Sequence, residues 1–189
     1  MVERDLAKVE VAGSSPVIRL KRVSEKVLAF CFIFSKREDG RMKQILIRKA
    51  VKEDLASIVS LAQLMWPENT GESLIEEFAD TLQDPKACCF LLLYEGKSIG
   101  FAQAQLRVDY VEGTRSSPVG YLEGIFVKEE FRRKGYAAKL VRECENWARE
   151  RGCSEFASDC PVENQISYMF HLHMGFLEAN RIICFTKKL

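Results

Sequence analysis

The chain has 189 residues, 47% of them hydrophobic, so it can form one domain with a substantial core but is too short for two ordinary domains. Its formal net charge is +1, yet residues 42–189 carry nineteen basic and twenty-one acidic side chains. This balance excludes a general electrostatic attraction for nucleic acid, so any anion site is local and a cationic partner is at least as plausible.

The cysteines and apolar runs indicate the compartment. Seven cysteines, an odd number without a CxxC pair, argue against a disulfide framework and favour reduced thiols in a cytoplasmic protein. The apolar run "VLAFCFIF", residues 27–34, is far shorter than the roughly 20 residues that span a bilayer. The "SKREDGR" that follows lacks the cleavage site of a signal peptide. We therefore expect no membrane partner.

Residues 1–41 show no clear amphipathic pattern, because the turn-rich "VAGSSPVIRL" precedes the apolar run. A strand-like "KQILIR" begins directly after Met42. We expect residues 42–189 to form the functional domain and residues 1–41 to be an N-terminal extension, either non-native or disordered. The alternative is a genuine additional hairpin packed on the domain.

The first half of the domain reads as one strand, two helices and a hairpin. "QILIR" is strand-like, and from Lys52 apolar residues recur at helical spacing until Pro67. Six acidic residues and no basic one lie between Trp66 and Asp84, which predicts an acidic loop and a second helix. "CCFLLLY" and "SIGFAQAQLRV" flank the turn "EGKS", which indicates a β-hairpin.

The second half begins with a polar loop, residues 109–118, and the strand "VGYLEGIFV". An amphipathic helix follows Gly135 and stops at Gly152. "EFASD" reads as a strand, residues 164–174 as a short helix, and residues 175–189 as a terminal hairpin. The order of elements predicts an α/β fold in which a mixed sheet carries helices on both faces.

The segment "EEFRRKGYAAKL" predicts an anion site. Three cations and Gly135 separate a strand from a helix, so unpaired backbone N–H groups converge where a phosphate could bind. Arg132, Gly135 and Ala137 fit the pattern R-x-x-G-x-A, whereas a Walker loop and a dinucleotide fold need other spacings. For this segment alone, a solvated basic cap before an ordinary helix is the alternative.

In this context the segment resembles the Gcn5-related N-acetyltransferase (GNAT) superfamily, in which R-x-x-G-x-A holds the pyrophosphate of acetyl-CoA. The resemblance implies a mostly antiparallel sheet that splays beside the strand "VGYLEGIFV", and Gly124 is where a bulge would start the splay. It implies no metal. The cofactor-binding residues that it implies are Ile125, Phe126, Val127, Arg132, Arg133, Lys134, Gly135, Tyr136, Ala137, Ala138 and Asn164.

A narrower likeness covers residues 42–189. The stretches "LMWPE", "IGFAQAQLRVDYVEG", "SSPVGYLEGIFV", "ASDCPVEN" and "HMGFLEANRIICFTKK" together resemble aminoglycoside 6′-N-acetyltransferases. This resemblance implies an aminoglycoside antibiotic as substrate and acetyl-CoA as co-substrate, and it implies a homodimer. The drug-contacting residues that it implies are Trp66, Tyr110, Glu123, Asp159 and Asn180.

Most of these residues also have a purely structural interpretation. Trp66 could close the first helix against the core, Asp159 could cap the next helix, and the acids of residues 68–84 could form solvated faces. Glu123 is harder to explain, because an ionised carboxylate among apolar strand neighbours is costly unless a charged or hydrogen-bonding group meets it. A substrate ammonium group would do so. Asn180 departs from some relatives, which have an acidic residue there.

We expect direct acetyl transfer to the 6′-amine, with Glu123 as the base and Asp159 holding the amine or sharing that task. His171 stands where many members of the superfamily have the tyrosine that protonates the leaving thiolate, although it could equally be a packed helix residue. His173 lies two positions further on and points elsewhere, so the pair is not a metal clamp. Cys160 has no histidine near it in sequence, so a cysteine nucleophile is not adopted.

Two other functions remain open at this stage. The same fold could acetylate another amine, such as a polyamine or a peptide N-terminus. The chain could also be a catalytically silent module that binds acyl-CoA. Retention of both the R-x-x-G-x-A segment and Glu123 disfavours the silent module.

Overall fold

The computed structural model describes residues 18–19, 31–36 and 42–188. A single sheet of seven strands follows chain order, and neighbouring strands are antiparallel except for the parallel pair β6 and β7. The strands are β1 (Ile18–Arg19), β2 (Cys31–Lys36), β3 (Met42–Lys49), β4 (Ala87–Tyr94), β5 (Lys97–Arg107), β6 (Val119–Val127) and β7 (Phe156–Ser158).

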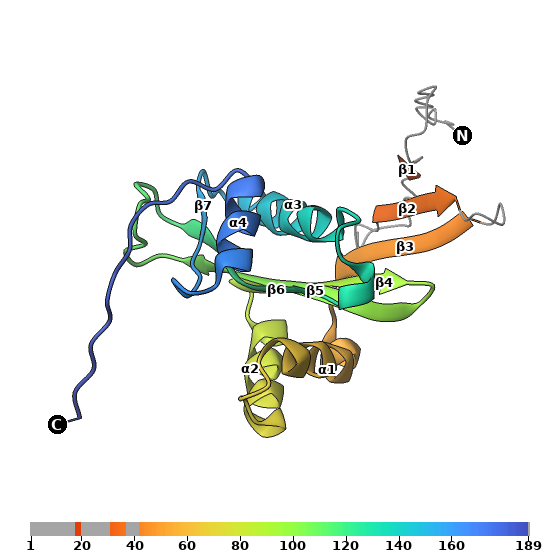
Figure 1. The fold of residues 1–189 in the computed structure, drawn as a ribbon, viewed down its shortest axis with the longest axis horizontal. Coiled ribbons are helices and arrows are strands. Elements are labelled where there is room, and N and C mark those ends of the chain that lie inside the picture. Colours follow the sequence, from red (N-terminus) through yellow and green to blue (C-terminus); the bar gives the residue numbers. More distant parts are fainter. Residues whose placement is uncertain (1–17, 20–30, 37–41, 189) are drawn as a thin grey trace, which may run out of the picture.

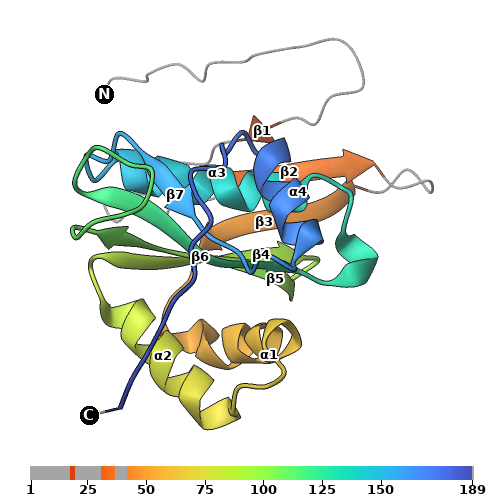
Figure 2. The same ribbon diagram turned by 60° about the vertical axis from the view of Figure 1, so that its left-hand side comes forward.

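Helices cover both faces of the sheet, as Figures 1 and 2 show, with α1 and α2 on one face and α3 and α4 on the other. This arrangement confirms the predicted fold class. No helix among the described residues is long and apolar enough to cross a membrane. The helices are α1 (Leu55–Met65), α2 (Gly71–Gln83), α3 (Tyr136–Arg149) and α4 (Gln165–His173), with single 3₁₀ turns η1 (Lys52–Asp54) and η2 (Glu129–Phe131).

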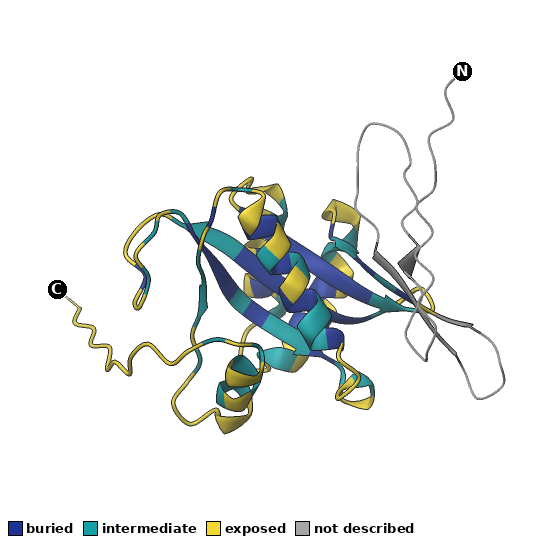
Figure 3. Cartoon of the chain, turned by 90° about the horizontal axis from the view of Figure 1, so that it is seen from above, coloured by how far each residue is buried: buried dark blue, intermediate teal, exposed yellow. Residues whose placement is uncertain are grey.

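The core has two layers because successive strand residues point to opposite faces. On β4, Cys88, Phe90 and Leu92 pack toward α3, whereas Cys89 and Leu91 pack toward α1 and α2. Both faces of this strand are covered, which explains why "CCFLLLY" is continuously apolar. Figure 3 shows the buried residues gathered in the sheet and in the helix faces that meet it.

A β-bulge lies where β5 meets β6. Gln103 pairs with Gly124 and Ala104 pairs with Leu122, so Glu123 is the extra residue on β6. The predicted irregularity beside Gly124 is therefore confirmed. The pairing of β6 with β7 ends at Leu122 and Ser158, while β6 continues to Val127. In the described part of the chain no strand covers this far stretch of β6 on the β7 side, so the sheet opens there.

Part of the segment before Met42 joins the sheet. β2 pairs antiparallel with β3 from Cys31 opposite Ile47 to Lys36 opposite Met42, and β1 pairs with β2. The rest of residues 1–41 lies outside the described residues. The domain boundary at Met42 stays a prediction.

The predicted terminal hairpin is wrong. Residues 176–188 form no strand, and Figure 1 shows them running away from the body of the molecule. A hairpin needs a covered apolar face to offset the cost of ordering it. Here the apolar side chains are 63–90% exposed, which shows that no described segment covers them: Leu177, Ile182, Ile183 and Phe185.

Candidate active site

The bulge places Glu123 on the face of the sheet that carries α1 and α2, where its carboxylate meets two side chains of β5. Glu123 Oε1 accepts hydrogen bonds from Gln105 Nε2 at 2.5 Å and from Arg107 Nε and Nη2 at 3.1 and 2.9 Å. Glu123 Oε2 accepts one further hydrogen bond, from Arg107 Nη2 at 2.9 Å. The carboxylate that the sequence singled out is thus paired within the chain, with lone-pair capacity left mainly on Oε2.

Arg107 connects this carboxylate to a second one. Its guanidinium lies 3.3 Å from the centroid of the Tyr121 ring, and the Tyr121 hydroxyl donates to Asp159 Oδ1 at 2.6 Å. Burial, then the hydrogen bond to Asp159, raises the pKa of Tyr121 well above its ordinary value, so the hydroxyl stays protonated and remains a donor. Glu123 and Asp159 therefore belong to one network that runs across β5, β6 and β7.

Trp66 lies directly against the bulge. It follows the last residue of α1, and a Cβ on Gly124 would come within 2.8 Å of the Trp66 ring. Only glycine at position 124 lets the ring approach β6 this closely. The ring is half-buried and its centroid is 6.2 Å from that of Phe101, so Trp66 closes α1 against the core and also lies against Gly124, the residue that follows Glu123.

The loop between β5 and β6 carries a second group of candidate residues. Tyr110 is 82% exposed, and its hydroxyl donates to Glu112 Oε2 at 2.8 Å. Asn180 Nδ2 donates to Glu112 Oε1 at 3.3 Å, so the structure brings Tyr110 and Asn180 together through a residue that the sequence did not single out. The acids of residues 68–84 are all exposed and give no focused pocket of their own.

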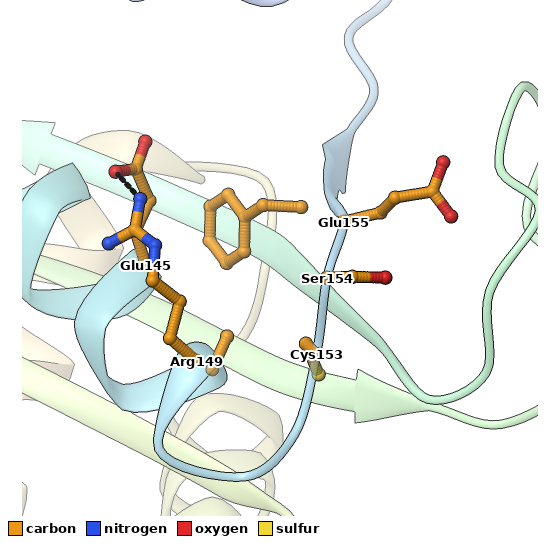
Figure 4. Close-up of a pocket in the computed structure, with 7 residues that line it drawn as sticks. Glu145, Arg149, Cys153, Ser154 and Glu155 are labelled. Atoms are coloured by element: carbon orange, nitrogen blue, oxygen red, sulfur yellow. Dashed lines mark hydrogen bonds and ion pairs between the residues drawn. The ribbon is translucent and has the colours of Figure 1, made fainter.

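Glu155 holds this loop in place. Its Oε2 accepts hydrogen bonds from the backbone N–H groups of Arg115 and Ser116 at 2.9 and 2.6 Å and from Ser116 Oγ at 2.5 Å. These bonds, with the Ser116 hydroxyl first among them, lower the pKa of Glu155. Figure 4 shows the Glu155 side chain pointing away from the shallow pocket at the end of α3, where Glu145 pairs with Arg149. That pocket lies outside the candidate site.

The N-terminus of α3 forms the other end of the site. Gly135 is its N-cap residue, has φ 74° and has no side chain to accept hydrogen bonds from the first turn. No heavy atom lies within 4 Å of where a Cβ would stand, so the backbone conformation, not crowding, requires glycine here. Residues 132–135 are exposed. Because no side chain caps the start of α3, the amide groups of its first turn have no side-chain acceptor at the N-cap, as an anion site needs.

Two of the predicted cations also shape the loop that precedes α3. Arg132 Nε donates to the carbonyl of Val127 at 2.8 Å, and Lys134 Nζ donates to the carbonyl of Glu130 at 2.6 Å. Arg133 has φ 58°, a rare conformation for a side chain with a Cβ. Tyr136 is buried in the core, while Ala137 and Ala138 are half-buried small residues beside the helix start.

His171 contacts the point where β6 and β7 separate. Its Nδ1 lies 2.7 Å from the carbonyl of Ser167, which only accepts, so Nδ1 carries a hydrogen. Its Nε2 lies 2.9 Å from Ser158 Oγ, which is also 3.0 Å from the carbonyl of Leu122. The hydroxyl of Ser158 thus lies between the imidazole of His171 and the carbonyl of Leu122. Asn164, an exposed residue, caps α4 through its Oδ1, which accepts from Ser167 N–H and leaves the amide NH₂ free of that bond.

Six contributors to this site escaped the sequence analysis: Gln105, Arg107, Glu112, Tyr121, Glu155 and Ser158. A signal existed for two of them. Gln103, Gln105 and Arg107 alternate with apolar residues along β5, which indicates a polar stripe on one face of a strand whose other face is buried. Glu155 contacts residues 39 and 40 positions away, and Ser158 contacts residues 36 and 13 positions away. No local pattern could reveal those contacts.

A family model described as "Acetyltransferase (GNAT) family" matches residues 55–176. The chain belongs to this family. Among similar GNAT proteins, the aminoglycoside N(6′)-acetyltransferase type 1 of Serratia marcescens is 37% identical over 138 residues, which cover 72% of this chain and 94% of the relative. That of Salmonella enteritidis is 38% identical over 142 residues, which cover 75% and 98%.

Solved structures of aminoglycoside acetyltransferases are also similar to this fold. Aminoglycoside N-acetyltransferase AAC(6′)-Iy in complex with CoA superposes with a TM-score of 0.76 at 37% identity, over 79% of this chain and 98% of that one. The same enzyme with the bisubstrate analogue CoA-S-monomethyl-acetylneamine gives a TM-score of 0.74 at 37% identity, over 77% and 99%. AAC(6′)-Ig from Acinetobacter haemolyticus gives 0.73 at 36% identity, over 76% and 98%.

Proposed function

We propose that this GNAT protein transfers the acetyl group of acetyl-CoA to the 6′-amino group of aminoglycoside antibiotics and thereby confers resistance. The observation that carries the proposal is the arrangement along β6. The strand leads from a Glu123–Asp159 carboxylate network to the uncapped N-terminus of α3, and the sheet opens between them. Relatives of this name and sequence similarity support the choice of substrate.

The α3 end suits the diphosphate of acetyl-CoA. The first-turn amides and the positive end of the helix attract an anion, and Arg132, Arg133 and Lys134 add charge around them. Ile125, Phe126 and Val127 offer backbone groups on the open edge of β6, where an extended arm could pair. Asn164 adds an exposed amide NH₂ beside the opening. When bound, acetyl-CoA supplies the activated acetyl group.

Glu123 is proposed as the base that takes a proton from the amine, because an ammonium has no lone pair with which to attack. Its Oε2 accepts a single hydrogen bond, so this oxygen is the atom that meets the proton, directly or through water. Asp159 holds the drug by its charge, and Trp66, Tyr110 and Asn180 add flat and polar surfaces. His171 acts as the general acid through Ser158, whose hydroxyl lies 2.9 Å from Nε2.

The direct test incubates the protein with acetyl-CoA and kanamycin and follows the release of free thiol, with spermidine in a parallel reaction. We expect thiol release with kanamycin, one acetyl group per drug, and acetylation at the 6′-nitrogen by mass spectrometry and NMR. Faster release with spermidine would favour a polyamine substrate instead. Binding of acetyl-CoA without turnover of either amine would support a silent acyl-CoA-binding module.

We further propose that the protein is a cytoplasmic homodimer. The four exposed apolar side chains of residues 177–185 support a second copy as the partner that covers them. The six cysteines for which the structure gives side chains are free, which suits a reducing compartment. Light scattering behind size exclusion should report twice the chain mass, and a monomer at micromolar concentration would contradict the dimer.

A further inference from the structure

The two carboxylates of the site differ in how far their charge is compensated. Glu123 accepts three hydrogen bonds from a guanidinium and one from an amide. Asp159 is exposed, and in the described residues its side chain has one hydrogen-bond partner, the neutral hydroxyl of Tyr121. The ion pair formed by Arg107 and Glu123 has no net charge, so Asp159 supplies the uncompensated negative charge of this network.

Arg107 is held from two sides. The carboxylate of Glu123 binds its Nε and Nη2, and the Tyr121 ring packs 3.3 Å from its guanidinium carbon. The Arg107 side chain is 37% exposed and that of Glu123 is 22% exposed, so solvent screens the pair only in part. A substrate ammonium that took the place of Arg107 would break the ion pair and the ring contact together, whereas one that binds Asp159 breaks neither.

We propose that Arg107 is a specificity-determining residue whose guanidinium fills the cation-binding side of Glu123 and so directs a charged ammonium of the substrate to Asp159. The inference rests on the proposed function and assigns different tasks to the two carboxylates. Asp159 binds a nitrogen that stays charged. Beside Glu123, the positive charge of Arg107 disfavours a second cation, which suits the nitrogen that has to lose a proton before it attacks.

This assignment makes an unusual prediction, namely that removing Arg107 tightens substrate binding while it slows turnover. In Arg107→Gln, the freed charge of Glu123 attracts an ammonium, so the Kd of kanamycin at saturating CoA should fall at least three-fold in calorimetry. The rate constant kcat should fall at least ten-fold, because the reacting nitrogen is then held in its charged form. Loss of a merely structural arginine would weaken binding and turnover together.

Two variants complete the design. Arg107→Met removes the charge but keeps packing against Tyr121, so it should behave like Arg107→Gln and guards against a folding defect of the latter. Asp159→Asn in the otherwise unaltered chain should raise the kanamycin Kd at least ten-fold. Thermal unfolding of each variant is measured alongside.

The outcomes separate two failures. If the unaltered chain acetylates no aminoglycoside, the proposed function fails. If it does, but a folded Arg107 variant binds kanamycin no tighter, or Asp159→Asn changes the Kd less than two-fold, then the role given to Arg107 is overturned while the function stands.

Discussion

The two ends of the site along β6 differ in the kind of chemical group that they present. At the Val127 end, the proposed binding groups are backbone amides of one short segment that follows Gly135, which has a left-handed conformation. At the Glu123 end, they are side chains from β5 and β6 and from Asp159, the residue directly after β7, and these side chains hold one another in place. We call these the amide end and the carboxylate end. The amide end depends on one backbone conformation, whereas a substitution of any one of the interacting side chains can disturb the carboxylate end.

The largest effect is expected at the carboxylate end. Glu123→Gln keeps the shape of the side chain but removes the proton acceptor, so kcat should fall by about 10²–10⁴-fold, the usual contribution of a general base. The affinity for acetyl-CoA should change little, because its binding groups lie elsewhere. Thiol-release kinetics and calorimetry measure the two quantities. Glu145→Gln, which breaks the surface pair with Arg149, is the matched control and should keep full activity. An unchanged kcat at every pH would refute the assignment of the base.

A substitution at the amide end should instead change the affinity for acetyl-CoA. Gly135→Asp forces a side chain into φ 74° and sets a negative charge at the helix start, so the Kd of acetyl-CoA should rise at least ten-fold, about 1.4 kcal/mol. Gly152→Asp is the matched control, because Gly152 also has a positive φ, 84°, and open space around its Cβ, at the other end of α3. Equal losses of affinity in the two variants would show that general strain, not the anion site, is responsible.

A smaller effect is expected where the two ends meet. Ser158→Ala removes the hydroxyl between His171 and the opening of the sheet, so kcat should fall about ten-fold with both substrate affinities preserved. Ser154→Ala, four residues earlier and exposed, serves as the control. His171→Phe should match Ser158→Ala, and the double variant should lose no more than either alone. Full additivity of the two losses would exclude a shared proton path.

The smallest effect concerns the loop that carries Tyr110. Glu155→Gln weakens three hydrogen bonds to Arg115 and Ser116, so KM for the drug should rise a few-fold while kcat stays constant. The pKa of Glu155 is lowered in the folded state, so its stabilising contribution is complete above the ordinary value of 4.5 and is lost as pH falls through the lowered pKa. The difference in Tm between the unaltered chain and Glu155→Gln should accordingly vanish at low pH. A difference that persisted there would mean that the stabilising contribution of Glu155 does not come from its ionised carboxylate.

The amide end could be predicted from the sequence because its parts are contiguous. Residues 127–138 contain the strand end, the cations, the glycine and the helix start, and short-range geometry fixes how they meet. The hairpin signal around "EGKS" likewise predicted two strands of the sheet, and the acid within "YLEGIFV" singled out Glu123.

The carboxylate network could not be predicted in the same way. Arg107 is 16 residues from Glu123, and Tyr121 is 38 residues from Asp159, so their contacts depend on strand register and on the bulge. The prediction of a terminal hairpin was wrong for a related reason. The pattern of "RIICF" shows which apolar side chains could be buried, but it does not show whether another segment of the same chain packs on them. Local sequence specifies elements, while pairing across the sheet decides which charges meet.

One crossed titration tests the central claim, that opposite ends of the site bind the two substrates. Calorimetry would measure CoA binding to the unaltered chain, Gly135→Asp and Asp159→Asn, and then kanamycin binding to each variant saturated with CoA. The account predicts that Gly135→Asp weakens only CoA binding and Asp159→Asn weakens only kanamycin binding. A variant with an unaltered Tm that lost affinity for both ligands equally would contradict it.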